Sequence, residues 1–443
     1  MAKKFHLISL GCGRNLVDSE VMLALLAQAG YEPSLEIAEA DFIIVNTCGF
    51  LQSARKEAVQ TLQRVFSSIK KGGRVIVAGC MVEKFQNDLE KLFPELFFYL
   101  GAGNVEEILE AVKSPVPGRI ITKKSYLNSP SLPRVLATAL GTAYLKIAEG
   151  CSKHCAYCLI PAIKGPLKSR PIEAVVEEFK NLLKRGVFEV VLIAQDLGDY
   201  GKDLYGKSAL KQLLRELLEV KGAFWLRLLY LYPEGIDVEL ADLFQSDPRL
   251  LPYLDMPLQH ISDKLLRRMR RKTSQEQIFN AIGLLKARVP KMVLRTTLMV
   301  GFPGEGKKEF QELLAFVKSG RIDHIGFFAF SPEKGTAAFH FPDQVDEKVK
   351  AERLQTIAEA QYRKVQKQNR RFLKQTLEVL VEGYHPDSKR LLKGRFYGQA
   401  PEVDPVVILN DFALVQAFGC LYQVQITGFA GYDLLGSAVG PKA

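Results

Sequence analysis

The segment YLKIAEGCSKHCAYC, residues 144–158, joins an apolar run to three closely spaced cysteines, Cys151, Cys155 and Cys158. The apolar run predicts a β-strand over residues 143–148. Further strands are expected at 189–193, 225–229, 294–300 and 324–328, with amphipathic helices such as 172–185 between them. Repeated βα units predict a parallel barrel, complete or partial, with its chemistry at the carboxyl ends of the strands. The three cysteines follow the first strand and therefore belong to that face.

Three other cysteines are far apart in the sequence but share one position in a second βα pattern. Cys12, Cys48 and Cys80 each follow an apolar run, and they are 36 and 32 residues apart, about one βα unit each. Helices are expected to open at Asp18 and to end at Gly30, and to span 51–70. Because the carboxyl ends of parallel strands meet at one edge of a sheet, we expect the three thiols to converge there.

The composition favours a folded cytoplasmic protein with more than one domain. The chain has 443 residues, 47% of them hydrophobic, and a net charge of +11, which hints at nucleic acid or a ribonucleoprotein as partner. The uncharged stretch 412–432 alternates polar and apolar residues, so it predicts strands and no membrane span. In a reducing compartment, clustered thiols more often bind metal or do chemistry than form disulfides. Cys420 has apolar neighbours and is predicted to be a buried core thiol.

The fold class predicted is α/β in three parts. A Pro- and Ser-rich stretch, 114–133, indicates a linker or irregular crossover. The stretch 347–374 carries nine Lys and Arg against three acids and is expected to form a long helix that closes the barrel. Beyond it, short alternating runs with glycines predict a small β-barrel. The predicted domains are residues 1–133 (parallel sheet), 136–372 (open or partial βα barrel) and 374–443 (small, OB-like β-barrel).

Each cysteine triplet suits an iron–sulfur cluster better than zinc. A structural zinc ion takes four protein ligands, and His154 adjoins Cys155 too closely for both to reach one small ion with good geometry. Thiolates also suit iron–sulfur clusters. A 4Fe–4S cluster held by three thiolates keeps one iron free for a substrate or cofactor. Two such triplets predict two sites of this kind.

The barrel triplet, C-x3-C-x2-C with Tyr157 before its last cysteine, resembles the radical S-adenosylmethionine (SAM) superfamily. That resemblance implies that the free iron binds SAM and that one electron cleaves SAM to a 5′-deoxyadenosyl radical. It also implies a set of residues that contact the cofactor. These are Tyr157, Gln195, Asp196, Arg295, Gly301 and Glu305.

The whole chain resembles the methylthiotransferase family, with an N-terminal cluster domain, a radical SAM barrel and a C-terminal TRAM domain. Within the family it is similar to the branch that modifies an aspartate of ribosomal protein S-twelve. The stretches that carry this resemblance are 9–20, 193–196, 200–201, 255–263, 295–305 and 330–336. Gly13, Leu197 and Gly306 depart from the usual pattern, which puts substrate contacts in doubt but removes no cluster ligand.

The resemblance implies methylthiolation of the β-carbon of that aspartate, with two 4Fe–4S clusters and two SAM molecules. The six cysteines would hold the clusters, and an electron donor such as flavodoxin or ferredoxin would be a further partner. The segment after Lys374 has no basic surplus, so its acids (Glu378, Glu382, Asp387, Glu402 and Asp404) are expected to meet a basic ribosomal protein. The basic helix at 347–374 is either a solvated face or a contact for ribosomal RNA.

Two other functions fit parts of the pattern. The same chemistry on transfer RNA would use the same clusters on an adenosine substrate. A non-catalytic iron–sulfur protein that assists ribosome assembly would hold clusters without cleaving SAM. Product analysis separates the first alternative from the ribosomal branch, and 5′-deoxyadenosine formation separates the second.

Overall fold

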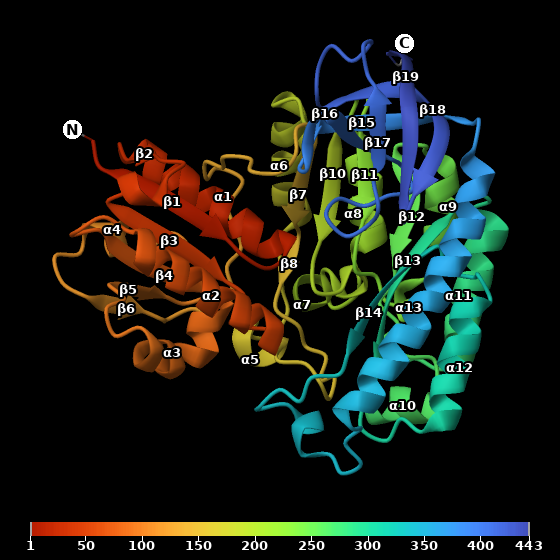
Figure 1. Cartoon of the computed structure of the whole chain (residues 1–443), viewed down its shortest axis with the longest axis horizontal. Coiled ribbons are helices and arrows are strands. Elements are labelled where there is room, and N and C mark those ends of the chain that lie inside the picture. Colours follow the sequence, from red (N-terminus) through yellow and green to blue (C-terminus); the bar gives the residue numbers. More distant parts are fainter. Residues whose placement is uncertain (1, 442–443) are drawn as a thin grey trace.

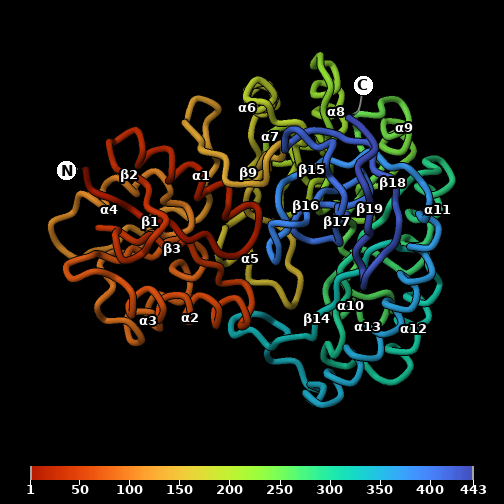
Figure 2. Tube along the Cα trace, turned by 45° about the horizontal axis from the view of Figure 1, so that its top comes forward, coloured from red at the N-terminus to blue at the C-terminus, as the bar shows by residue number. Residues whose placement is uncertain are grey.

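The computed structural model describes residues 2–441, which form two parallel sheets, one closed barrel and a small two-stranded antiparallel sheet. The N-terminal sheet lies beside the second sheet, and the C-terminal barrel caps one end of the second sheet (Figure 1). Figure 2 shows the short helix α5 (Ile160–Lys164) between the two parallel sheets. No helix within the described residues combines the length and apolar composition that crossing a membrane requires.

The N-terminal sheet is parallel throughout, in the order β2-β1-β3-β4-β5-β6. Its central strand, β3, is buried along its whole length because helices cover both faces, with α1 and α4 on one side and α2 and α3 on the other. The strands are β1 (Lys4–Ser9), β2 (Glu32–Pro33), β3 (Phe42–Thr47), β4 (Arg74–Gly79), β5 (Phe98–Leu100) and β6 (Gly118–Ile120). The helices are α1 (Gly13–Gln28), α2 (Gln52–Ser68), α3 (Cys80–Leu92) and α4 (Ile108–Lys113).

Two details of this part differ from the sequence-based expectation. Helix α1 begins at Gly13, five residues before the expected opening at Asp18. Asp18 looks like a first-turn acid, but it is buried in mid-helix and pairs with lysines of the neighbouring part of the chain. The expected linker 114–133 contains β6, the edge strand of the sheet, and the buried Tyr126.

The second sheet is an open barrel of six parallel strands in the order β14-β13-β12-β11-β10-β7, with β7 and β14 as its edges. Its core lies between the sheet and an outer layer of helices. The strands are β7 (Thr142–Lys146), β10 (Glu189–Ile193), β11 (Trp225–Leu228), β12 (Leu250–Asp255), β13 (Val293–Val300) and β14 (His324–Ala329). The outer helices are α6 (Ile172–Lys184), α8 (Leu210–Leu218), α9 (Val238–Ser246), α11 (Gln275–Arg288), α12 (Lys307–Lys318) and α13 (Glu347–Asn369). Short elements near the strand ends are β8 (Ala148–Glu149), β9 (Lys168–Ser169), α7 (Lys202–Tyr205) and α10 (Asp263–Arg268).

The C-terminal part is a closed five-stranded barrel in the order β15-β16-β17-β19-β18. Its interior is a single apolar cluster that includes Val379, Leu392 and Val424. Cys420, the first residue of β18, is exposed, so the prediction of a buried thiol is wrong. The residue stands at the rim of the barrel, beyond the apolar layer that begins at Tyr422. The strands are β15 (Thr376–His385), β16 (Ser388–Phe396), β17 (Val407–Asp411), β18 (Cys420–Ala430) and β19 (Asp433–Pro441).

The C-terminal barrel is fixed to the amino-terminal ends of the second sheet by buried polar contacts. Arg395 pairs with Glu189, the first residue of β10, and Arg227 also bonds Glu189, at 2.6 Å. Tyr253 donates to Asp404, at 2.5 Å. The cysteines lie at the opposite, carboxyl-terminal ends of the strands, where ligands bind in such sheets.

These contacts also correct an expectation about charge. The acids after Lys374 were expected to face a basic ribosomal protein, but Glu382 and Asp404 have almost no exposed side-chain surface. Glu382 pairs with Arg395, and Asp404 pairs with Arg295 of β13. Their charges therefore join two parts of the chain to each other.

Candidate active site

The three dispersed cysteines meet at one edge of the N-terminal sheet. Cys12 precedes α1 just after β1, Cys48 follows β3, and Cys80 begins α3 directly after β4. The strands β1, β3 and β4 are neighbours in that order, so the three chain segments end side by side. Asn15 braces the edge by donating to the carbonyl oxygens of Leu10 and Thr47, both at 3.0 Å.

Two glycines allow the loops around these thiols to approach one another. At Gly11 an added Cβ would lie 2.8 Å from the Cβ of Cys48, and the backbone φ is +98°. At Gly79, before Cys80, φ is +94° and a Cβ would lie 2.3 Å from Oδ1 of Asn46. Only glycine meets both the conformation and the spacing at these positions.

The barrel triplet occupies the loop between β8 and α5, at the carboxyl end of the first barrel strand. The backbone N–H of Lys153 donates to Sγ of Cys151, and that of Ile160 donates to Sγ of Cys158, each at 3.4 Å. The N–H of Cys158 bonds the carbonyl of Cys155, at 3.1 Å. Backbone donors to sulfur stabilise the thiolate form that a metal requires.

Both triplets line one cavity of about 400 Å³ between the two parallel sheets. Arg14, Lys153 and Lys164 bring positive charge to its wall. Apolar and aromatic side chains make up much of the remaining wall, among them Phe50, Ile160, Tyr230, Tyr232, Met299, Phe328 and Phe330. The expectation that the dispersed thiols converge is met, and the structure adds that they face the second triplet.

Burial raises the pKa of four of these thiols above the usual cysteine value. It raises the pKa of Cys80 to about 12, against the opposing effect of the Lys164 ammonium, and raises that of Cys158 to about 12 as well. Burial also raises the pKa of Cys48 and Cys151. A metal must therefore displace protons from these sulfurs when it binds.

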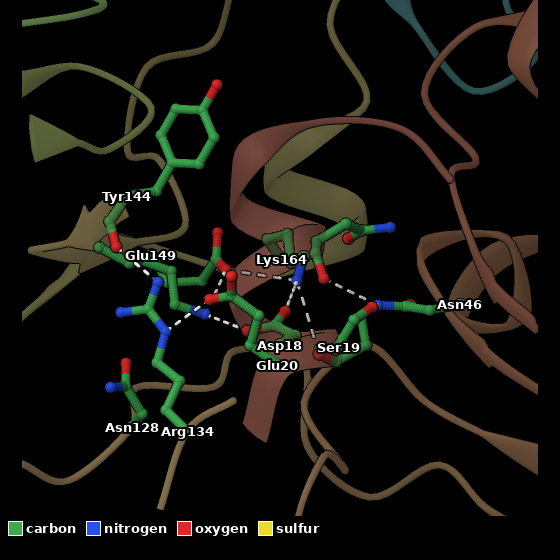
Figure 3. A network of polar contacts seen from close by, with 12 residues as sticks. Asp18, Ser19, Glu20, Asn46, Asn128, Arg134, Tyr144, Glu149 and Lys164 are labelled. Carbon is green, nitrogen blue, oxygen red and sulfur yellow. Dashed lines mark hydrogen bonds and ion pairs between the residues drawn. The ribbon is translucent and has the colours of Figure 1, made fainter. Parts of the chain in front are cut away.

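A buried polar network holds the two parts of the site in register (Figure 3). Lys164 of α5 lies 3.5 Å from Asp18 of α1 and 3.3 Å from Glu149 of β8. Lys146 of β7 also pairs with Asp18. Beside them, Arg134 bonds Glu20 of α1 at 2.6 Å. Since α1 begins next to Cys12 and α5 follows Cys158, this network fixes one triplet against the other.

A second set of polar contacts joins the segment after β14 to the N-terminal part of the chain. Glu333, almost fully buried, accepts hydrogen bonds from the N–H of Gln52 at 2.8 Å and from Arg55 at 2.6 Å. Both donors belong to α2 of the N-terminal sheet. The cavity is thus enclosed by contacts from both parallel-sheet parts of the chain.

The six residues expected to contact SAM take three kinds of position, and two of them line the cavity. Tyr157 and Gln195 line the cavity with the cysteines. Asp196 stands behind the wall, where it accepts from Lys153 and from the N–H of Gly198. The other three, which the cavity does not include, are Arg295 (paired with Asp255 and Asp404), Gly301 (φ +73°) and Glu305 (paired with Arg353).

Several wall residues were not anticipated from the sequence. Lys164 and Arg14 lie within a few residues of cysteines, but their charges gave no sign that the chain would bury them. Tyr230 has a φ of +66°, which is uncommon outside glycine and marks a strained position next to the site. Tyr230 and Tyr232 could have been found as wall residues from the sequence, because both lie in a loop that follows a barrel strand.

The donor set fits iron–sulfur clusters. Six thiols, backbone N–H donors to sulfur and buried cations around an enclosed space are the environment that thiolate-bound clusters need. Within residues 2–441, no group of three or more His, Cys, Asp or Glu side chains is arranged to hold a single metal ion.

Three family models match successive parts of the chain. Residues 4–101 match uncharacterized protein family UPF0004, residues 145–317 match the radical SAM superfamily, and residues 375–439 match the TRAM domain. The first match covers five of the six strands of the N-terminal sheet, the second covers most of the open barrel without β14, and the third covers most of the C-terminal barrel.

Relatives match over nearly the whole length. The ribosomal protein uS12 methylthiotransferase RimO of Chlamydia abortus is 51% identical over 438 residues, which cover 98% of this chain and 95% of the relative. RimO of Trichlorobacter lovleyi is 42% identical over 444 residues, covering 99% and 98%. Among solved structures, the radical SAM methyltransferase TsrM of Kitasatospora setae has a TM-score of 0.53 at 17% identity, covering 74% of this chain and 73% of that chain. This structural likeness shows a shared fold.

Proposed function

The chain belongs to the RimO family of radical SAM methylthiotransferases, and from that premise we propose that it methylthiolates the β-carbon of an aspartate in ribosomal protein uS12. The observation that carries the proposal is the single cavity lined by six thiols from two parts of the chain. Sulfur can reach a carbon that a radical has activated only if the radical-generating site and the sulfur-handling site face one enclosed space.

We assign one 4Fe–4S cluster to Cys12, Cys48 and Cys80 and a second to Cys151, Cys155 and Cys158. The pair, when bound, supplies one-electron reduction of SAM and sulfur for transfer. The assignment of functions follows the three sequence segments, with 1–133 for sulfur handling, 136–372 for radical generation and 374–443 as the TRAM domain.

The chain's own residues prepare the space for this chemistry. Lys164 and Arg14 offset negative charge at the sulfurs, and Tyr230 and Phe328 limit water around a reactive radical. Tyr157 and Gln195 would contact SAM, a role supported by their position in the wall of the cysteine cavity. Asp196 orients Lys153 at the wall, and Arg295, Gly301 and Glu305 would act on SAM only through the strands and turns that they hold.

The proposed reaction also requires or permits contacts with molecules other than the substrate protein. An electron donor such as flavodoxin or ferredoxin supplies the reducing electron. The basic helix α13 presents less positive charge to ribosomal RNA than its sequence indicated. Its Lys350 and Arg353 point inward, where they bond the carbonyl of Phe330 and the carboxylate of Glu305. The basic side chains of α13 that are exposed, including Arg363 and Lys367, provide the surface for such a contact.

Metal analysis after anaerobic reconstitution tests the two-cluster assignment. We expect about eight irons per wild-type chain and about four in Cys12→Ala, because one four-iron cluster loses a ligand. Cys420→Ala is the matched control and keeps about eight, since its exposed thiol lies on the C-terminal barrel. An equal iron content in Cys12→Ala and wild type would contradict the assignment.

The substrate is tested with the reconstituted enzyme, SAM and dithionite. We expect a peptide from the uS12 loop to gain a methylthio group, detected by mass spectrometry, and adenosine-modified transfer RNA to remain unchanged. Modification of the RNA alone would overturn the substrate. Clusters without any 5′-deoxyadenosine would favour a non-catalytic role.

A further inference from the structure

A hollow of about 620 Å³ lies beside the cysteine cavity and is separated from it by a thin wall. Lys153, Cys155 and Tyr232 line both spaces and form this wall. Exposed side chains make up part of the rim of the hollow, among them Arg270 and Lys272. Cys155, a member of the barrel triplet, therefore lies between the cavity and a surface that another protein can reach.

One side of this rim belongs to a strongly basic stretch of the chain. Five of the six residues at 267–272, which form the end of α10 and the turn after it, are Lys or Arg, and we call this segment the basic turn. Arg267, Arg270 and Lys272 are exposed, and within the described residues no ion pair joins any of the three to a carboxylate. Unpaired cations gathered on one turn favour an acidic partner.

The basic turn is held directly against the loop that carries the barrel triplet. The N–H of Ala156, which follows Cys155, donates to the carbonyl of Met269 at 2.9 Å. Ala156 also packs with Leu265 and Met269 in one buried apolar cluster. A protein that docks on the basic turn therefore lies next to a cysteine of the radical-generating site.

The acids that line the hollow reduce its positive charge only in part. Asp199 pairs with Lys202 at 2.5 Å, and Asp203 accepts from the N–H and the hydroxyl of Ser169 at 2.8 and 2.6 Å. Glu234 is exposed at the rim and has no ion pair in the part of the chain that the structure describes, so it opposes one free cation. The three free cations of the basic turn outnumber it.

We propose that the basic turn is the docking site of the electron donor, an acidic flavodoxin-like protein that reduces the cluster of the barrel triplet. The inference rests on the proposed function, because it takes the reduction of SAM as the step that needs the electron. One electron leaves the fully reduced flavin of the carrier. This electron breaks the bond between the sulfonium sulfur and C5′ of SAM, which yields methionine and the 5′-deoxyadenosyl radical.

Two physical requirements of electron delivery meet at this surface. The cavity between the two sheets has to hold SAM and the substrate, so a protein carrier needs a separate approach, and the hollow provides one that ends at Cys155. Electron transfer slows steeply as the distance between donor and acceptor grows, which favours the thin wall. Attraction between the basic turn and an acidic carrier speeds association by about tenfold or more and weakens as salt is added.

Formation of 5′-deoxyadenosine by the reconstituted full chain tests the proposal with two sources of electrons. Flavodoxin, kept reduced by its reductase and NADPH, has to dock, whereas dithionite is a small molecule and does not. The test variant combines Arg270→Gly with Lys272→Gln, because glycine suits the φ of +57° at position 270. We expect its KM for flavodoxin to be about tenfold higher at low salt, with an unchanged dithionite-driven rate. The KM of wild type should rise with salt more steeply than that of the variant.

Two further variants make the expectation specific to this surface. Glu234→Gln removes the opposing charge at the rim and should lower the KM for flavodoxin by about two- to threefold. Arg363→Gln combined with Lys367→Gln changes the net charge by the same amount as the test variant but on the exposed face of α13. This control should keep the KM within about twofold of wild type.

The possible outcomes separate the docking site from the proposed function. An unchanged KM in the test variant, or an equal rise in the α13 control, would overturn the docking site while the proposed function stands. A lower dithionite-driven rate in the test variant would overturn it too, because the turn would then serve SAM or the fold. Normal flavodoxin kinetics with loss of uS12 modification on the assembled small subunit would assign the turn to ribosomal RNA instead. No 5′-deoxyadenosine from wild type with dithionite would refute the proposed function and this inference with it.

Discussion

The cysteines show what a sequence can predict about single residues. Cys12, Cys48 and Cys80 could be placed at one edge because parallel strands share a direction, and the position of each thiol at the end of an apolar run was visible. Cys420 could not be placed in this way. Apolar neighbours do not show whether a residue lies inside a barrel or at its rim, and here it lies at the rim.

His260 gives a prediction about pH at the residue scale. Burial lowers its pKa to about 3, and its Nδ1 accepts the N–H of Ser262 at 3.0 Å. The unfolded chain takes up a proton below pH about 6.5, whereas the folded chain stays neutral until about 3. Stability from this residue is therefore complete above pH 6.5 and is lost as the pH falls toward 3. Between pH 7 and 5 the loss is about 2 kcal/mol.

Urea unfolding at pH 7 and pH 5 measures this contribution. In His260→Asn the amide oxygen can still accept from Ser262 and does not titrate, so the variant should lose about 2 kcal/mol less than wild type between the two pH values. Equal losses in both proteins would show that His260 does not titrate as its burial indicates.

At the scale of elements, β12 is a strand of the second sheet that was missed for a physical reason. β12 contains Pro252, which cannot donate to a neighbouring strand, so its sequence did not read as a central strand. The structure accommodates it with an irregular register against β11. Long buried strands such as β10 were predictable because an uninterrupted apolar run is what a doubly covered sheet requires.

Helix α5 carries a prediction about the joint between the two cluster sites. Lys164→Met keeps much of the side-chain volume but removes one of the two lysines that pair with Asp18 and Glu149, leaving Lys146. Breaking a buried ion pair from one side costs about 3–5 kcal/mol, so the variant should unfold at markedly lower urea concentration. The double variant with Asp18→Asn, which also removes the buried negative charge, should recover part of that loss. Equal stability of the single variant and wild type would contradict the role of Lys164 as a clamp.

At the scale of the whole molecule, the order of the three parts was predictable but their docking was not. Residue patterns revealed three parts because two series of βα units are separated by the Pro- and Ser-rich stretch 114–133 and are followed by short alternating runs. Contacts between them depend on single charged residues, such as Glu382 and Asp404, whose burial no local pattern announces. Two of the five acids that seemed available for a partner, Glu382 and Asp404, therefore serve the chain itself.

This docking can be tested apart from the chemistry. Arg395 is fully buried between the C-terminal barrel and the second sheet, where it pairs with Glu189 and Glu382. Arg395→Met leaves two carboxylates without their shared partner, although Glu189 keeps Arg227. We expect a loss of about 3–5 kcal/mol in unfolding free energy and faster proteolysis near residue 374, where the barrel joins α13.

The cluster sites should be spared by the same change, because they lie at the opposite ends of the strands. Iron content after reconstitution should remain at about eight per chain in Arg395→Met. Lys393→Met is the matched control, since it removes a less buried charge from the same strand, β16, and should change neither stability nor cleavage by more than a small amount. A drop in iron content with unchanged proteolysis would mean that the barrel acts on the active site and not on its own docking, which would refute the separation of the two ends.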